Sequence, residues 1–135
     1  MTFQGERPIY MQLMDEIKGQ IVAGRLAPGA RIDSIRELAA FYAVNPNTVQ
    51  RALSELERDG LLSTRRASGK MVTEDAGMIQ KVRAEMASER IESLLSAMEA
   101  LGFNAGETRE LFDRALEARS CQTAAAGIIQ GGAHE

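Results

Sequence analysis

The sequence predicts a mostly helical protein with one small β-hairpin, organised as an N-terminal domain at residues 1–75 and a helical region at residues 76–119. Three observations support this fold class. Apolar residues recur at helical spacing in several segments, good capping residues precede two of them, and a strand–turn–strand pattern follows the third. Because only 4% of the residues are aromatic and Trp is absent, we expect an aliphatic core.

The first predicted helix begins at Pro8 and stops before Gly24, and a turn follows at Pro28. Its apolar residues recur every four positions and are expected to form one buried stripe, which consists of Ile9, Leu13, Ile17 and Ile21. This helix therefore packs one face against the rest of the N-terminal domain.

Two short helices are predicted to follow, separated by a break at residues 44–48. Ser34 and Glu37 have the spacing of a capping box, which marks the start of the first of them. Asn45 can cap the next helix, and Pro46 suits its first position because the missing N–H has no partner there. The buried face of that next helix is expected to consist of Val49, Ala52, Leu53 and Leu56. Two short helices joined in this way form a helix-turn-helix arrangement.

A basic hairpin is predicted directly after these two helices. Residues 61–65 are expected to form a strand, residues 66–70 a turn and residues 71–73 the returning strand. A hairpin with cationic side chains at this position is a wing. The predicted fold is therefore a winged helix-turn-helix domain followed by a two-helix C-terminal element.

The C-terminal element is expected to bury its apolar stripe by forming a homodimer. A long helix should end at Gly102, and Asn104 should cap a last helix that continues to about Arg119. The remainder, residues 120–135, is rich in Ala and Gly and is expected to be a disordered tail. Because two helices alone cannot bury their apolar stripe, we expect a second copy to cover it. The residues assigned to dimerisation are Ile91, Leu94, Leu95, Met98, Leu111 and Phe112.

The polar surface of the helix after Asn45 is the candidate for DNA recognition. With the apolar face inward, Asn47 and Arg51 point outward and Gln50 lies at their flank, a set of the size that enters a major groove. Side chains near the helix N-termini and on the hairpin would contact phosphates or a minor groove. The complete candidate set is Ser34, Arg36, Asn45, Asn47, Thr48, Gln50, Arg51, Arg65, Arg66 and Lys70. The alternative is that these side chains are only solvated or only cap helices.

The net charge of −3 neither supports nor excludes a nucleic-acid partner. Residues 1–75 contain ten basic and ten acidic residues, whereas residues 76–135 contain six and nine, so the acidity is C-terminal. Within residues 31–72, seven basic residues exceed five acidic ones. The local placement of charge therefore decides the question.

Composition disfavours several other functions. No apolar run reaches the roughly 18–20 residues of a membrane span, and the N-terminus carries no export signal, so we expect a cytoplasmic protein. Cys121 and His134 are the only residues of their kinds, which excludes a disulfide framework or a Cys/His metal site within one chain. Because no nucleophile–base pair and no phosphate-binding loop stand out, we expect neither an enzyme nor a bound cofactor.

The order and spacing of motifs across residues 8–72 resemble the N-terminal signature of the GntR family of bacterial transcription regulators. The resemblance implies DNA contacts at Arg36, at residues 45–50 and around Arg66. The matching segments are Pro8-Ile9-Tyr10 with Gln12, Gly24-Arg25-Leu26-Ala27-Pro28-Gly29, Ser34-Ile35-Arg36-Glu37-Leu38-Ala39, and the run from Val44 through Gly60-Leu61.

Three positions depart from the family pattern. Asp33 stands where a Pro is usual, and its carboxylate would repel a nearby phosphate unless it turns away or caps the helix. Ala67 stands where the wing turn often has Gly, which weakens the expectation of wing contacts. Pro46 replaces an Arg that some members place on DNA, so Asn47 and Gln50 should carry more of the reading.

The short C-terminal region is similar to that of the YtrA-like subfamily, because only about 45 residues follow the wing before the tail. In that subfamily a short helical pair dimerises the protein, and members often control transporter operons. The resemblance implies a homodimeric repressor of a transporter operon that binds an inverted-repeat DNA operator. The sequence leaves open whether a small-molecule effector binds between the C-terminal helices. A winged-helix module that binds protein instead of DNA is the alternative.

Overall fold

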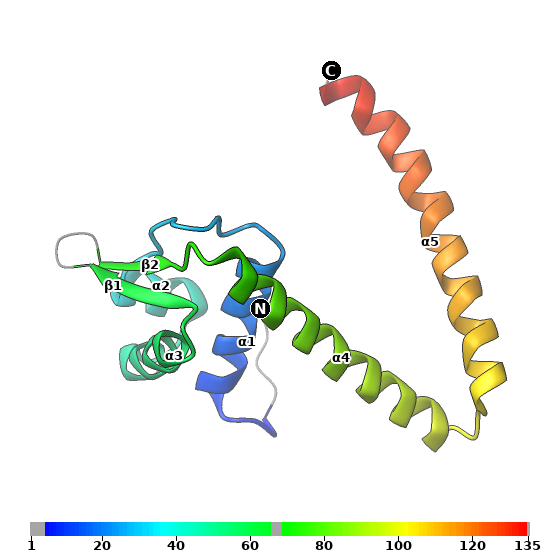
Figure 1. Ribbon diagram of the computed structural model, residues 1–135, viewed down its shortest axis with the longest axis horizontal. Helices are drawn as coiled ribbons and strands as arrows, with labels where there is room; N and C mark the ends of the chain where they lie inside the picture. Colours follow the sequence, from blue (N-terminus) through cyan, green and yellow to red (C-terminus); the bar gives the residue numbers. More distant parts are fainter. Residues whose placement is uncertain (1–4, 66–68, 135) are drawn as a thin grey trace. The chain divides into compact units, whose positions relative to one another are not determined.

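The computed structural model describes residues 5–65 and 69–134, with side chains up to residue 122 (Figure 1). The chain divides into two compact units, Met1–Ala87, which we call the head, and Ser88–Glu135, which we call the C-terminal unit. The predicted fold class is confirmed, because a hairpin follows the helix-turn-helix and two helices follow the hairpin. The elements are α1 (Ile9–Val22), α2 (Ile35–Tyr42), α3 (Pro46–Arg58), β1 (Leu62–Arg65), β2 (Gly69–Val72), α4 (Ala76–Ala100) and α5 (Ala105–His134).

Helix α1 contributes the first buried stripe of the head. Leu13, Ile17 and Ile21 are at most 3% exposed, as their four-residue spacing predicts. Ile9 was assigned to the same stripe but is 45% exposed, because it is the first residue of α1 and stands at the end of the helix. Gly24 follows the helix with a φ of 83°, a conformation that suits glycine at a helix end.

Helices α2 and α3 begin at the predicted caps. Ser34 Oγ accepts from the backbone N–H of Glu37 at 3.1 Å, and Glu37 Oε1 accepts from the backbone N–H of Ser34 at 3.1 Å, which completes the capping box. Asn45 Oδ1 accepts from the backbone N–H of Asn47 at 2.7 Å. Between the helices, Ala43 adopts the left-handed conformation with φ 56°, which costs a non-glycine residue roughly 1–2 kcal/mol. This conformation ends α2 and starts the short turn to α3.

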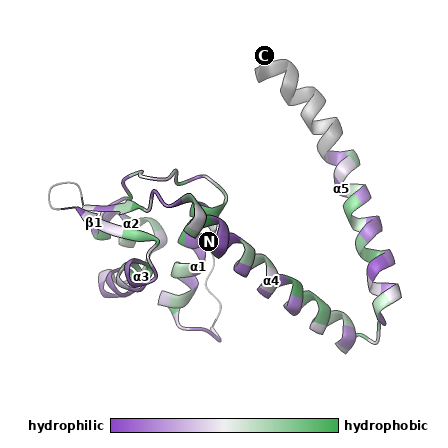
Figure 2. Ribbon diagram, in the orientation of Figure 1, coloured by the Kyte–Doolittle hydropathy of each residue, from purple (hydrophilic) through white to green (hydrophobic). Residues whose placement is uncertain are grey.

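The underside of α3 is the centre of the head. It packs against α1, α2 and β1 and is at most 1% exposed, as predicted for Val49, Ala52, Leu53 and Leu56. Figure 2 shows many hydrophilic residues along α3, which therefore combines an apolar underside with a polar outer face. The rest of the core comes from α1, α2, the hairpin and the start of α4, through Ile32, Leu38, Ala39, Leu61, Leu62, Val72 and Ile79.

Strands β1 and β2 pair antiparallel, with Leu62 opposite Val72 and Arg65 opposite Gly69. The segment before α2 runs along the hairpin, because the N–H of Ile32 donates to the carbonyl of Lys70 and the N–H of Val72 donates to the carbonyl of Ala30. Sequence periodicity did not predict that the segment before α2 would pair with the hairpin. Of the predicted turn at residues 66–70, residues 66–68 lie outside the described part of the chain, whereas Gly69 and Lys70 belong to β2, where they pair with Arg65 and Thr64.

The head extends beyond the predicted boundary at residue 75. Ile79 of α4 is 6% exposed and belongs to the core, and Met78 and Val82 pack against that core. Asp75 Oδ1 accepts from the backbone N–H of Met78 at 3.1 Å and so caps this helix. Because these apolar side chains complete the core, the part of α4 up to Ala87 belongs to the head.

The C-terminal unit contains the rest of α4, a tight turn and α5. Gly102, with a φ of 91°, ends α4, and Asn104 and Glu107 form a second capping box at the start of α5. The α5 backbone is helical to His134, whereas the sequence analysis places the helix end near Arg119 and a disordered tail after it. The Ala run in this segment favours a helix, and its Gly residues, each costing about 1 kcal/mol, led to the shorter prediction.

Candidate nucleic-acid interface

The outer face of α3 presents the predicted reading residues to solvent. Asn47, Gln50 and Arg51 are exposed, and Thr48 is half-buried. The buried underside fixes their direction, because a helix with four core residues on one side can turn only its other side outward. The structure therefore brings these predicted residues together at the N-terminal end of α3. Asn45 lies at the same end, where its side-chain oxygen caps the helix.

The start of α2 provides a second exposed group, which contains Ser34 and Arg36. Ser34 is committed to the capping box, whose hydrogen bonds from the backbone N–H and the hydroxyl of Ser34 hold the pKa of Glu37 below its ordinary value. In the described part of the chain, no carboxylate forms an ion pair with Arg36. Its charge is therefore available to a phosphate.

At the wing, Arg65 and Lys70 have different environments. Arg65 is exposed at the end of β1. Lys70 Nζ lies 2.7 Å from Glu57 Oε1 and 2.9 Å from Thr64 Oγ1, and its side chain is 18% exposed. The structure thus gives Lys70 a protein partner where the sequence analysis expects a DNA contact. Arg66, also predicted to contact DNA, lies outside the described residues.

Glu57 connects α3 to both strands of the wing. Its second carboxylate oxygen accepts from the Thr64 hydroxyl at 2.7 Å, so Glu57, Thr64 and Lys70 form a closed triangle of hydrogen bonds. The hydrogen bond from Lys70, followed by that from Thr64, lowers the pKa of Glu57. This triangle braces the wing against α3, and the sequence analysis missed it because Glu57 and Lys70 belong to different elements.

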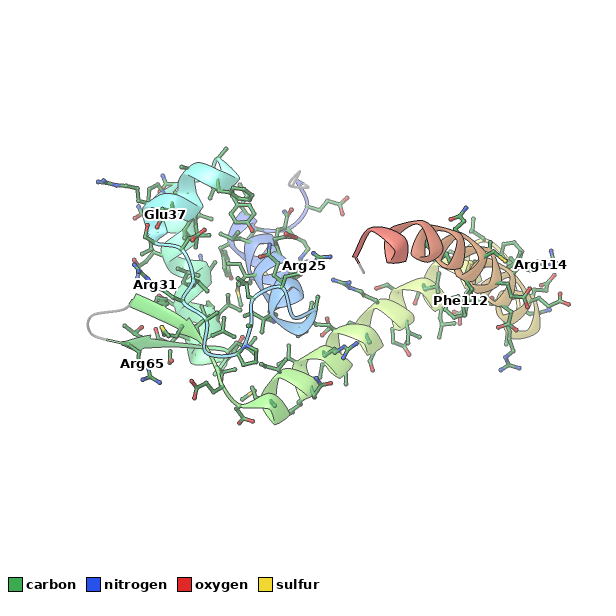
Figure 3. The ribbon with its side chains drawn as sticks, turned by 90° about the horizontal axis from the view of Figure 1, so that it is seen from above. Arg25, Arg31, Glu37, Arg65, Phe112 and Arg114 are labelled. Atoms are coloured by element: carbon green, nitrogen blue, oxygen red, sulfur yellow. The ribbon has the colours of Figure 1, made fainter. Side chains whose placement is uncertain are left out.

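A groove joins the start of α2 to the wing. It has a volume of about 270 Å³, and Arg31 and Lys70 are among its lining residues, together with Ile32, Asp33, Ser34, Ile35, Leu53, Thr64 and Gly69. Figure 3 shows Arg31 and Arg65 on opposite sides of the hairpin in that view. Arg31 is exposed, and the sequence analysis missed it because a loop residue has no periodic signal. It adds a cation to the predicted surface.

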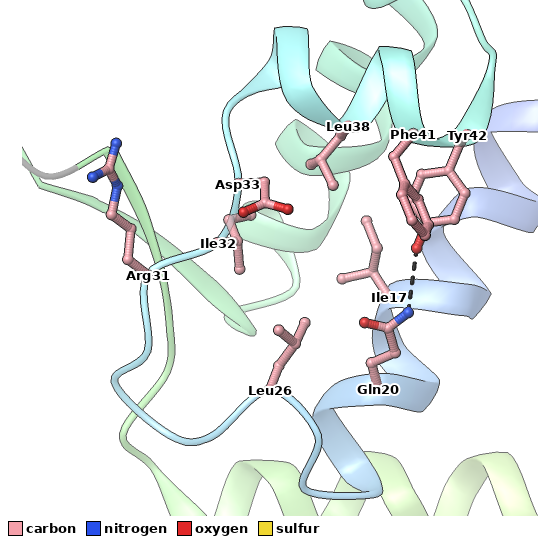
Figure 4. Close-up of a pocket in the computed structure, with 9 residues that line it drawn as sticks. All are labelled: Ile17, Gln20, Leu26, Arg31, Ile32, Asp33, Leu38, Phe41 and Tyr42. Atoms are coloured by element: carbon pink, nitrogen blue, oxygen red, sulfur yellow. Dashed lines mark hydrogen bonds between the residues drawn. The ribbon is translucent and has the colours of Figure 1, made fainter.

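Asp33 turns away from the cation beside it. Figure 4 shows its carboxylate on the side of Leu38 and Phe41, whereas Arg31 points the other way. These residues line a hollow of about 180 Å³ between α1, α2 and the preceding loop, in which Gln20 Nε2 donates to Tyr42 Oη at 3.2 Å. The sequence allows Asp33 to avoid repelling a phosphate either by turning away or by capping α2. The structure shows that it turns away, because Ser34 is the cap of α2.

Arg51 rests on an aromatic ring from another helix. Its guanidinium carbon lies 3.8 Å from the centroid of the Tyr10 ring of α1, a cation–π geometry. Both residues line a hollow of about 410 Å³ between the starts of α1 and α3, with Ile9, Asn47 and Thr48. Tyr10 appears in no predicted site, because its role depends on how α1 packs on α3.

The C-terminal unit keeps most of its predicted dimerisation residues at the surface. Ile91, Leu94, Leu95, Leu111 and Phe112 are between 38% and 55% exposed, and Met98 is half-buried. Figure 3 shows Phe112 on α5. An apolar hollow of about 170 Å³ lies between α4 and α5, lined by Leu94, Met98, Thr108, Leu111, Phe112 and Ala115.

Metal and membrane features can be judged for the described residues. In that part of the chain, no three His, Cys, Asp or Glu side chains lie close enough together to hold a metal ion. No helix among those residues combines the length and the apolar character that crossing a bilayer requires.

The head has the architecture of a winged helix-turn-helix DNA-binding domain. It presents a polar helix from a compact aliphatic core, with exposed cations at the start of α2 and on the hairpin beside it. Residues 9–72 match the family described as bacterial regulatory proteins, gntR family. The chain is 38% identical over 108 residues to the HTH-type transcriptional regulator YhcF of Bacillus subtilis, which covers 80% of this chain and 89% of that protein. The chain therefore belongs to the GntR family of DNA-binding transcription regulators, which are not enzymes.

Other similar proteins extend the comparison to most of the chain, and one of them was solved with its DNA operator. The HTH-type transcriptional repressor YtrA of Bacillus subtilis is 42% identical over 69 residues, which are 51% of this chain and 53% of that protein. A GntR family transcriptional regulator from Listeria monocytogenes superposes with a TM-score of 0.76 and 36% identity, covering 83% of this chain and 98% of that chain. The AraR DNA-binding domain in complex with operator ORX1 superposes with a TM-score of 0.50 and 30% identity, over 53% of this chain and 93% of that domain.

Proposed function

We propose that this protein is a homodimeric repressor that reads an inverted-repeat operator with the N-terminal half of α3. The observation that carries the proposal is the exposed set of Asn47, Gln50 and Arg51, which a buried underside holds outward. Asn and Gln can pair with adenine and Arg with guanine, each contact contributing about 1–3 kcal/mol of discrimination. Arg36, Arg31 and Arg65 are exposed around this face, and we assign them to phosphates.

Some predicted contacts receive a narrower role in this proposal. Ser34 and Asn45 cap their helices, so they would present helix N-termini to phosphates through backbone N–H groups. Thr48 is half-buried beside them and would bind the backbone at the same place. We assign Lys70 to bracing the wing, because Glu57 and Thr64 already hold its ammonium group.

Binding to DNA selected from a random duplex pool tests this reading face. We expect Arg36→Ala and Arg51→Ala each to weaken binding to the enriched sequence, whereas the matched control Arg25→Ala, also exposed in the head, should leave affinity near that of the wild type. Affinity should fall steeply with salt, because phosphate contacts release counterions. Unchanged affinity in both test variants would refute the face. A protein-binding module, the alternative, would show no such salt dependence on DNA.

The homodimer is proposed from the exposed apolar residues of the C-terminal unit. A second copy would cover Leu94, Leu95 and Phe112 and fill the hollow between α4 and α5, which we therefore assign to the partner and not to an effector. Two heads would then contact half-sites about one helical turn, or a multiple of it, apart. Sedimentation measurements should give a dimer for the wild type and for Ser93→Lys and a monomer for Leu94→Lys. A dimeric Leu94→Lys variant would place the interface elsewhere.

We further propose repression of a transporter operon. The support is the similarity to the HTH-type transcriptional repressor YtrA, together with the transporter control that the YtrA-like resemblance implies. Deleting the gene should raise transcripts of a neighbouring transporter operon, and the intact gene in trans should restore them. Transcripts that fall on deletion would instead indicate an activator.

A further inference from the structure

The ring of Tyr10 lies under a side chain that we assign to base reading. Tyr10 is half-buried and packs against the core of the head, whereas Arg51 is exposed. The core residues Leu13 and Ile17 of the same helix hold α1 against α3. The packing of α1 therefore holds the Tyr10 ring in place, and the guanidinium carbon of the longer Arg51 side chain lies 3.8 Å from the ring centroid.

Stacking leaves the hydrogen-bonding edge of the guanidinium available. The group is planar, and its five N–H donors lie in that plane, while the cation–π contact with Tyr10 uses the face. A bidentate contact with the O6 and N7 atoms of guanine uses only the edge. One arginine can therefore contact Tyr10 and a base at the same time. Because the ring restricts the side chain before DNA arrives, less conformational freedom is lost on binding.

The surroundings favour a reading role over a structural one for this cation. In the described part of the chain, Arg51 forms no ion pair with a carboxylate, so its charge is not neutralised within the protein. The hollow beside it separates the starts of α1 and α3 and has Asn47 and Thr48 on its wall. A nucleic-acid group that entered this hollow would meet the guanidinium and the N-terminus of α3 together.

We propose that Tyr10 is a positioning residue that sets how strongly Arg51 discriminates between base pairs. The ring would hold the guanidinium at the orientation in which its edge faces the major groove. This inference rests on the proposed reading face. It assigns a specificity role to α1, a helix outside the helix-turn-helix.

The test measures base preference instead of overall affinity. A duplex enriched by the wild-type protein from a random pool is varied one base pair at a time, and Kd is measured for the wild type, Tyr10→Leu, Tyr10→Phe, Arg51→Ala and the double variant Tyr10→Leu/Arg51→Ala. We expect Arg51→Ala to abolish preference at one base pair, and Tyr10→Leu to lower that same preference roughly three- to tenfold. Tyr10→Phe, which keeps the ring, should retain it. The double variant should discriminate no worse than Arg51→Ala alone.

The outcomes separate this proposal from the reading face. If the wild type enriches a sequence and Arg51→Ala loses one preference, but Tyr10→Leu keeps it, only the role of Tyr10 is refuted. Tyr10→Leu weakening all duplexes equally would make Tyr10 a purely structural residue, and a stronger preference would mean that the ring holds Arg51 away from the base. If Arg51→Ala changes no preference, the role of Tyr10 fails and Arg51 is removed from the reading face, which then rests on Asn47 and Gln50. Thermal unfolding of each variant shows whether it is folded.

Discussion

The head buries the apolar stripes of its helices in a core, whereas the C-terminal unit leaves its apolar stripes at the surface. Every member of the buried core cluster lies between Leu13 and Ile79, within the head. Among residues 88–122, whose side chains are described, none is buried, although leucines recur there at helical spacing. The same chemical pattern therefore closes a core within one chain in the head and leaves an open surface in the C-terminal unit. An amphipathic stripe predicts that a helix packs against something. Only the surrounding elements decide whether the partner is another part of the same chain.

The largest effects are expected from one leucine-to-alanine substitution in the head and one in the C-terminal unit. Their outcomes test whether the two units differ in how they use their leucines. Leu53→Ala removes a side chain that is 1% exposed, so we expect the head to lose about 2–5 kcal/mol of unfolding free energy. Leu94→Ala should instead weaken the dimer, with a loss of stability that shrinks as the protein concentration rises. Thermal unfolding at several concentrations measures both. Equal, concentration-independent losses would mean that the C-terminal unit has a core of its own.

Removing one helix cap from each region sharpens the comparison. Asn45→Ala should destabilise the head by about 1 kcal/mol, because the backbone N–H of Asn47 loses its acceptor. Asn104→Ala removes the matching cap of α5 and should leave the unfolding of the head unchanged. Chemical denaturation followed by a probe in the head measures both changes, with Asn45→Asp as a capping-competent control. A loss from Asn104→Ala as large as that from Asn45→Ala would show that the two units unfold together.

The Glu57 triangle predicts a smaller, pH-dependent effect confined to the head. The folded-state pKa of Glu57 lies below its unfolded-state value, so its stabilising contribution is complete above the unfolded pKa and is lost as pH falls through the folded pKa. Because the Glu57 side chain is 38% exposed, this contribution should stay below about 1 kcal/mol. Glu57→Gln should therefore lose less stability on acidification than the wild type. Parallel pH profiles of unfolding free energy would refute this linkage.

The smallest expected effect concerns the salt dependence of DNA binding. If Lys70 braces the wing, Lys70→Met should leave the slope of log K against log salt close to that of the wild type. Arg36→Ala, which removes a cation that we assign to a phosphate, should reduce the slope by about 0.9. A similar reduction in Lys70→Met would return Lys70 to the DNA contacts that the sequence predicts.

Sequence reasoning was most accurate for the helix caps and for the buried face of α3. The caps at Ser34, Asn45 and Asn104 and the buried face of α3 depend on residues at most a few positions apart, and the structure has them as predicted. It was less accurate at boundaries. Ile79 extends the head beyond residue 75, and α5 is helical beyond Arg119, because core contacts and the helix propensity of an Ala run do not show in a periodic pattern.

The sequence by itself determined which segments form helices, where they begin and which face of each is apolar, because these properties follow from propensity, capping and spacing along the chain. Only the tertiary structure decided which polar side chains meet. Lys70 donates a hydrogen bond to Glu57 instead of facing solvent, and Arg51 stacks on the ring of Tyr10. Both contacts join elements that are separate in the sequence, so periodicity cannot predict them. Such contacts depend on how helices and strands pack in space, and packing is a property of the whole core.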